Sequence, residues 1–188
     1  MTRLPTYAEA LAAFRWHDVL NELGWSGRNT INLAATIVDR HAASAVADRT
    51  ALIWLGDSGA ERRISFKELS EQSSRFANLL VRLGIRKGDR VAALLPRLPE
   101  TLAVILGVLK TGAVYVPLFA GFGAEAVRYR LTHSGARLLC TTDDHRSLVP
   151  DDIRPEVVCL ARGRAPVRDG DHDFHAAMAK ESAAFDPV

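Results

Sequence analysis

The chain has 188 residues, a net charge of +2, 48% hydrophobic residues and 24% charged residues. This composition is typical of a globular domain with a sizeable core, and the scattered Lys and Arg residues argue against nucleic acid as a partner. Cys140 and Cys159 lack metal or redox spacing, and the N-terminus lacks the apolar run of a signal peptide. We therefore expect buried, reduced thiols in a cytoplasmic protein.

The first half of the sequence predicts helices around one β-hairpin. Apolar residues at helical spacing and flanking polar or glycine residues set the boundaries. The expected elements are a helix over 7–24, a helix over 33–43 with Asn32 as its N-cap, hairpin strands over 50–55 and 62–66, and a helix that begins at a Ser65–Glu68 capping box and ends at Gly84.

The second half alternates strands with helices. Strands are expected over 90–95, 113–116, 136–141 and 156–160, and helices over 99–110, 124–133 and 174–184, with a polar loop over 162–170. This alternation predicts an α/β fold with a mostly parallel sheet and helices on its faces. Ligand sites are then expected beyond the carboxyl ends of the strands.

Residues 109–123, LKTGAVYVPLFAGFG, form the stretch around which this pattern is organised. They predict a helix end, a tight turn at Gly112, a buried central strand that Pro117 stops, and a glycine-rich loop before a new helix. A strand, a glycine loop and a helix N-terminus are the general ligand-binding geometry of open α/β sheets. Although Lys110 is the only charge between residues 101 and 123, the glycines and Pro117 interrupt the window, so no membrane span is expected.

Two other functional interpretations, a dinucleotide site and a metal site, are less favoured by the sequence. Residues 121–126 fit G-x-G-x-x-A, with Asp143 about 20 residues further on, which is the outline of a dinucleotide site. However, residues 117–120 separate the strand from the glycines, where that fingerprint requires an immediate turn. The acidic and histidine clusters at 143–145 and 171–175 are expected to be solvated loops, so no metal site is predicted.

Two longer motifs carry a resemblance to a known family. ISFKEL at 64–69 matches an L-[TS]-Y-x-E-L pattern, and LKTGAVYVPL at 109–118 matches L-K-x-G-x-x-Y-x-P-L, with GDRVA and P-x-x-P-E between them. Over residues 32–188 the chain resembles the N-terminal part of AMP-forming acyl-CoA synthetases, members of the adenylate-forming superfamily. FAGF followed by EAV is most similar to the acetyl- and short-chain acyl-CoA synthetase branch.

The resemblance implies a partial flavodoxin-like sheet, the first sub-domain of an incomplete AMP-binding domain over 32–188, preceded by a helical lead over 1–31. For the parent enzyme it implies ATP, Mg and CoA as cofactors and a small carboxylate as substrate. The carboxylate attacks ATP to give an acyl-adenylate and pyrophosphate, and the thiol of CoA then displaces AMP. The family's phosphate loop, ribose-binding aspartate and adenylation lysine have no counterpart in these 188 residues. We therefore expect no catalytic residue and no activity from this segment alone.

The resemblance also implies a site for the nucleotide end of CoA, formed by Phe119, Ala120 and Gly121 and by Arg146 after the next strand. Ala120 stands where the branch often has glycine, and Arg146 is displaced by about one position. The competing interpretation is a tight strand-to-helix turn and a solvated arginine. At the level of the whole protein, a non-catalytic remnant or an assembly module, and less favourably a dinucleotide-binding protein, remain alternatives. A sheet taken from a larger domain is also expected to self-associate through an exposed edge.

Overall fold

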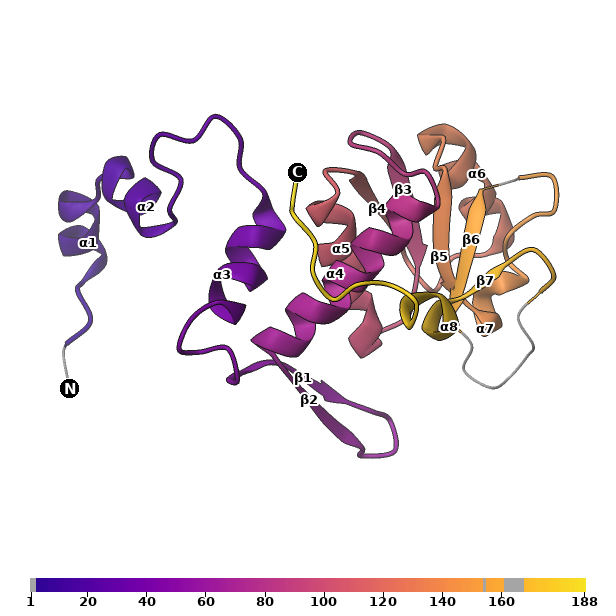
Figure 1. The fold of residues 1–188 in the computed structure, drawn as a ribbon, viewed down its shortest axis with the longest axis horizontal. Helices are drawn as coiled ribbons and strands as arrows, with labels where there is room; N and C mark the ends of the chain where they lie inside the picture. The colour runs from indigo at the N-terminus through magenta and orange to yellow at the C-terminus, as the bar shows by residue number, and fades with distance from the viewer. Residues whose placement is uncertain (1–2, 154, 161–167) are drawn as a thin grey trace. The chain divides into compact units, whose positions relative to one another are not determined.

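The computed structural model describes residues 3–153, 155–160 and 168–188, and the chain divides into two compact units, Met1–Ile31 and Asn32–Val188 (Figure 1). Each unit has its own local structure. In the first, no helical residue is buried, whereas the second contains three buried hydrophobic clusters. The core of the described protein therefore lies in the second unit.

The first unit contains two short helices, α1 (Tyr7–Ala13) and α2 (Trp16–Glu22), so the prediction of one helix over 7–24 was wrong. A capping box between Thr6 and Glu9 starts α1. The chain is extended at Phe14 and Arg15, and the Arg15 guanidinium donates to the carbonyls of Ala12 and Phe14. These side-chain bonds satisfy acceptors at the helix end, which stabilises the break.

The second unit opens with a helical run that Asn32 caps, as predicted. The Asn32 side-chain oxygen accepts from the backbone nitrogens of Ala34 at 3.0 Å and Ala35 at 3.2 Å. The run then forms a π-helical turn, η1 (Ala35–Asp39), followed by α3 (Arg40–Ala42). A π-turn changes the direction of the side chains after it, and here it ends at Asp39.

The hairpin strands β1 (Thr50–Leu55) and β2 (Glu61–Ser65) form a separate antiparallel sheet, with Gly59 at φ +82° in the turn. The capping box at Ser65 and Glu68 starts α4 (Phe66–Arg82), as predicted: the Ser65 hydroxyl accepts from the Glu68 nitrogen and the Glu68 carboxylate accepts from the Ser65 nitrogen. Local hydrogen bonding thus fixes where the hairpin ends and the long helix begins.

The described part of the chain forms a five-stranded sheet in the order β4-β3-β5-β6-β7, in which all neighbouring strands are parallel. The strands are β3 (Arg90–Leu94), β4 (Val114–Leu118), β5 (Leu138–Thr142), β6 (Glu156–Leu160) and β7 (His172–Asp173). The connecting helices are α5 (Pro99–Lys110), α6 (Ala124–Ser134), α7 (Asp143–Arg146) and α8 (Phe174–Met178). The predicted α/β class and parallel sheet are confirmed.

Helices cover both faces of this sheet (Figure 1). On one face, side chains of α4, α5 and α8, among them Phe76, Val104 and Phe174, pack with alternate residues of β3, β5 and β6. On the other face, Val127 and Leu131 of α6 pack with the remaining strand residues. Burial on both faces explains the nearly continuous apolar runs in β3 and β5.

The stretch 113–118 differs from its prediction in two ways. Pro117 does not stop the strand, because β4 continues to Leu118 and Pro117 pairs in register with Ala93. In addition, β4 lies at an edge of the described sheet rather than at its centre, and Val114 is 48% exposed. The edge position explains the first difference, since proline has no N–H to donate and is tolerated where a strand has one neighbour.

The C-terminal strap, residues 181–188, replaces the second half of the helix predicted over 174–184 (Figure 1, yellow). The Asn78 amide donates to the carbonyls of Ser182 and Ala184, both at 2.9 Å, and the Val188 nitrogen donates to the carbonyl of Lys110 at 3.0 Å. Contacts to α4 and to the end of α5 thus hold the strap in an extended path. The predicted loop over 162–170 falls mostly outside the described residues.

Among the described residues, no helix is both long and apolar enough to cross a membrane. Cys140 is fully buried in β5. The side chain of Cys159 lies outside the described part of the structure.

Candidate functional site

The loop after β4 holds three of the residues to which the sequence assigns a ligand. Phe119 is 70% exposed, and its ring meets that of Phe122 edge to face, with centroids 5.7 Å apart. A Cβ at Gly121 would lie 2.5 Å from the Phe119 ring. Glycine at this position therefore makes room for an aromatic ring of the loop itself.

The start of α6 follows this loop without a side-chain cap, because its N-cap residue is Gly123. The Arg130 guanidinium lies 4.0 Å from the centre of the Phe122 ring, a cation–π contact that ties the loop to the helix behind it. An exposed aromatic ring next to an uncapped helix N-terminus can accept a ligand with a flat ring and an anionic group.

Arg146, the fourth assigned residue, ends the short helix α7. Its Nε donates to Asp171 Oδ2 at 2.6 Å and its Nη2 to Oδ1 at 3.1 Å, and the two side chains are 17% and 5% exposed. Arg146 is thus held in a nearly buried bidentate ion pair and is not a solvated loop residue. The sequence predicted a solvated loop at Asp171, because nothing local links this residue to an arginine 25 residues earlier.

The topology brings the glycine loop and Arg146 to the same edge of the sheet. β4 and β5 both pair in parallel with β3, so the segments that follow them leave from the same ends of the strands. This is the edge at which open α/β sheets bind ligands.

The histidines and acids considered for metal binding have other roles. Asp173 accepts from the Ala176 nitrogen at 2.7 Å and caps α8, His172 contacts Glu156, and the hydroxyl of Thr142 lies 2.7 Å from Nδ1 of His145. Across the described ranges, no three His, Cys, Asp or Glu side chains gather to hold a metal ion.

Lys110, the last residue of α5, is a buried cation. The Lys110 ammonium is fully buried and lies 2.7 Å from Asp39 Oδ1, 2.8 Å from the Ser74 hydroxyl and 3.1 Å from the Ser70 carbonyl. These three acceptors match the three N–H donors of an ammonium group. Burial lowers the pKa of Lys110 below its usual value, and the hydrogen bond and charge of Asp39 partly oppose that shift. The Lys110 network therefore joins η1, α4 and α5 and is structural.

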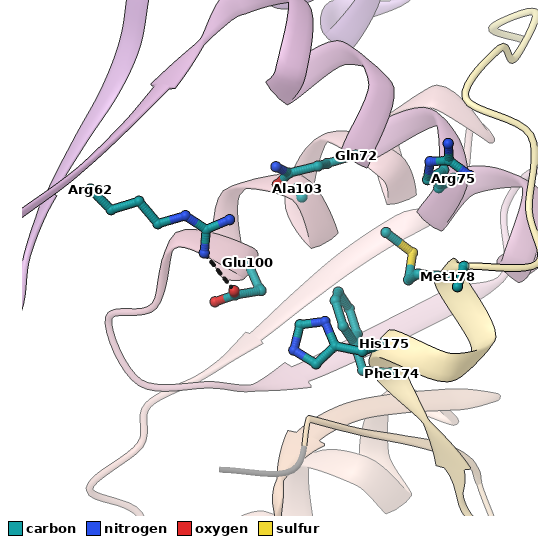
Figure 2. A pocket seen from close by; sticks show the side chains of 9 residues that line it. Arg62, Gln72, Arg75, Glu100, Ala103, Phe174, His175 and Met178 are labelled. Atoms are coloured by element: carbon teal, nitrogen blue, oxygen red, sulfur yellow. Dashed lines mark hydrogen bonds and ion pairs between the residues drawn. The ribbon is translucent and has the colours of Figure 1, made fainter.

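A pocket of about 230 Å³ opens between the hairpin, α4, α5 and α8 (Figure 2). It is lined by residues that lie far apart in the sequence: Arg62, Gln72, Arg75, Glu100, Ala103, Phe174, His175, Met178 and Ala179. No sequence motif pointed to it, because each element contributes only one to three of these side chains. We call it the α4–α8 pocket.

The α4–α8 pocket combines an apolar floor with a charged rim. Ala103, Phe174 and Met178 are almost fully buried. On the rim, Arg62 Nη1 lies 3.1 Å from Glu100 Oε1, and Figure 2 shows this pair facing His175 across the pocket. Arg75 donates one hydrogen bond, to the Glu181 carbonyl. A concave site with an apolar base and a few polar groups is typical of small-molecule binding.

Comparison with known proteins gives concordant results. Residues 38–185 match the family described as AMP-binding enzyme. The chain is 45% identical over 121 residues to the acetyl-coenzyme A synthetase of Escherichia coli (strain K12), covering 64% of this chain and 18% of that protein. It is 36% identical over 165 residues to the acetyl-coenzyme A synthetase of Streptomyces coelicolor, covering 82% of this chain and 25% of that protein.

Among solved structures, an acyl-CoA synthetase of Brucella canis superposes with a TM-score of 0.88 at 34% sequence identity. The superposition covers 98% of this chain and 34% of that one. The chain thus spans 18% to 25% of the length of these curated relatives and about a third of the solved one.

Proposed function

We propose that this chain, which belongs to the AMP-binding enzyme family, serves as the N-terminal part of an AMP-forming acyl-CoA synthetase that joins a small carboxylate to CoA at the expense of ATP. One observation carries the proposal. The fold matches an acyl-CoA synthetase over 98% of the chain at 34% identity, which is far more than a shared architecture requires. The proposed location is the cytoplasm, in keeping with two cysteines, Cys140 and Cys159, that lack metal or redox spacing.

Within such an enzyme, the proposed role of this segment is to hold the nucleotide end of CoA. Phe119 offers an exposed ring for the base, while Ala120 and Gly121 are small enough for a ligand to approach the backbone. Arg146 supplies a guanidinium for phosphate, and Asp171 fixes the plane of that group through Nε and Nη2. These assignments rest on the position of both segments at the carboxyl edge of the sheet.

Calorimetric titration of the purified chain with CoA tests this role. We expect saturable binding, and we expect Arg146→Ala to weaken it by about ten- to a hundredfold. This factor corresponds to the usual free energy of a hydrogen bond to a charged group. Arg137→Ala is the matched control, since Arg137 pairs with Asp89 at the opposite end of β5 and should leave the affinity unchanged. If the unsubstituted chain, Arg146→Ala and Arg137→Ala bind CoA with equal affinity, Arg146 is not part of the CoA site.

The activity is tested separately, by pyrophosphate release from ATP in the presence of acetate. The 188 residues alone are expected to release none, because the family's phosphate loop and adenylation lysine have no counterpart in them. A longer chain that joins these residues to the family's phosphate loop and adenylation lysine is expected to release pyrophosphate and to form acetyl-CoA. CoA binding without activity of such a longer chain would favour the alternative of a binding or assembly module.

We also propose that the isolated chain self-associates through β4, the edge strand with exposed Val114. Sedimentation velocity over a wide range of concentrations measures this directly. A monomer at every concentration would rule it out.

A further inference from the structure

We propose that the α4–α8 pocket binds a small organic carboxylate whose apolar body is no larger than one aromatic ring. The site is separate from the glycine loop and Arg146, and it is independent of the proposed ligase activity. Its floor, its charge balance and its unused hydrogen-bonding groups each support a ligand of this class.

The charge balance of the rim favours an anion. The Glu100 carboxylate is 16% exposed and is already paired with Arg62, and it lies in the first turn of α5, where the helix dipole also offsets negative charge. Among the residues that the structure describes, Arg75 has no carboxylate partner, and its Nη1 lies against the backbone carbonyl of Glu181. The pocket therefore holds an uncompensated positive charge, and a guanidinium in partly buried surroundings binds a carboxylate through parallel hydrogen bonds.

Two further polar groups add hydrogen-bonding capacity to the pocket. The side-chain amide of Gln72 is half-buried, and His175 contacts the edge of the Phe174 ring. In the described part of the chain, neither the Gln72 amide nor the His175 ring nitrogens have a hydrogen-bond partner. Polar groups within a pocket are rarely left without partners, so donors and acceptors here are available to a ligand.

The floor selects for an apolar body on the anion. Phe174 is 3% exposed, Met178 is 7% exposed and Ala103 is 1% exposed, and none of them offers a polar side-chain atom to a ligand. Water on such a floor makes few hydrogen bonds, so its displacement by a ring or short chain is favourable. An inorganic oxyanion would use Arg75 but gain nothing from this surface.

NMR titration of the ¹⁵N-labelled 188-residue chain with benzoate is the direct test. Benzamide keeps the ring without the charge, and inorganic phosphate keeps the charge without the ring. We expect saturable benzoate binding, with chemical-shift changes concentrated at the pocket residues, and at least tenfold weaker binding of benzamide and phosphate. Binding of benzamide or phosphate as tight as that of benzoate would overturn the proposal, as would no saturable binding of benzoate.

Two substitutions locate the site. Arg75→Met should weaken benzoate binding by about ten- to a hundredfold, which corresponds to the usual free energy of a hydrogen bond to a charged group. Gln72→Leu should weaken it by about two- to tenfold, because a neutral hydrogen bond contributes less free energy. Arg82→Met is the matched control: Arg82 is also on α4 and contacts Glu181, but it does not line the pocket. If Arg82→Met and Arg75→Met weaken binding equally, a loosened C-terminal strap explains the loss and the site assignment fails. Gln72→Leu keeps the test informative should Arg75→Met not fold.

Discussion

Two basic side chains beside α4 have opposite surroundings. Lys110 is fully buried, and three acceptors from η1 and α4 satisfy its ammonium group. Arg75 lines an open pocket and, in the described part of the chain, donates one hydrogen bond, to a backbone carbonyl. A buried cation that loses one of its partners is left uncompensated at a large cost in stability, whereas a half-buried cation without a counter-charge is available to a ligand. The sequence motif includes Lys110, whereas the proposed carboxylate site includes Arg75, which no motif singled out.

The largest expected effect concerns the carboxylate that compensates Lys110. Asp39→Ala should lower the free energy of unfolding by about 3–5 kcal/mol, because it leaves a buried ammonium group without its counter-charge. Urea denaturation measures the change. Asp152→Ala is the control, since the Asp152 side chain is 67% exposed in its pair with Arg128, and a loss within about 0.5 kcal/mol is expected.

A double variant sharpens this prediction. Asp39→Leu combined with Lys110→Met removes both charges together, and it should recover most of the stability that Asp39→Ala loses. A double variant as unstable as the single one would show that the Lys110 network contributes through its hydrogen bonds to Ser70 and Ser74 instead.

The next effect concerns the close approach of α4 and α5 that seals Lys110. A Cβ at Gly107 would lie 2.8 Å from the Ser73 carbonyl oxygen and 2.8 Å from the Phe76 ring. Gly107→Ala should therefore cost about 2 kcal/mol through overpacking, even though alanine favours a helix. Thermal unfolding compares it with Thr132→Ala on the exposed face of α6, which should be neutral or slightly stabilising. A Gly107→Ala protein as stable as the original would show that the helices can separate without cost.

Arg75→Met should have a smaller effect on stability, about 1 kcal/mol, because only one hydrogen bond is lost. The same urea experiment measures it alongside Asp39→Ala. If Arg75→Met lowers the free energy of unfolding as much as Asp39→Ala does, Arg75 is a structural cation like Lys110 and the contrast between the two residues fails.

The smallest effect is the alkaline pH dependence of stability. Burial lowers the pKa of Lys110 below 10.5, so between its folded and unfolded pKa values the unfolded chain binds more protons and stability rises with pH. Burial raises the pKa of Tyr115 above 10.0, so its contribution is present below pH 10 and is lost as pH rises further. The free energy of unfolding, measured from pH 8 to 11, tests both contributions. Lys110→Met should abolish the rise of stability with pH, and Tyr115→Phe should abolish the loss of stability above pH 10. An unchanged profile in either variant would contradict the corresponding shift.

Much of the fold could be predicted because its signals are local. The capping box at Ser65 and Glu68 and the Asn32 cap use neighbouring residues, and each appears as expected. The break at Phe14 and Arg15 could not be predicted, because the apolar spacing continues through it while side-chain bonds to the helix end decide the backbone. Pro117 was misjudged because its tolerance depends on β4 being an edge strand, which is a property of the sheet.

By itself, the sequence determined the α/β class, the alternation of strands and helices in the second half of the chain and the resemblance to acyl-CoA synthetases, since periodicity, caps and motifs are carried by residues close together in the chain. Only the tertiary structure decided the partners of its charged groups. Arg146 pairs with Asp171, Lys110 pairs with Asp39, and Arg75 lines the same pocket as Phe174 and Met178. Coulomb and hydrogen-bond energies depend on distance and burial in space, and these are set when distant helices pack against one sheet.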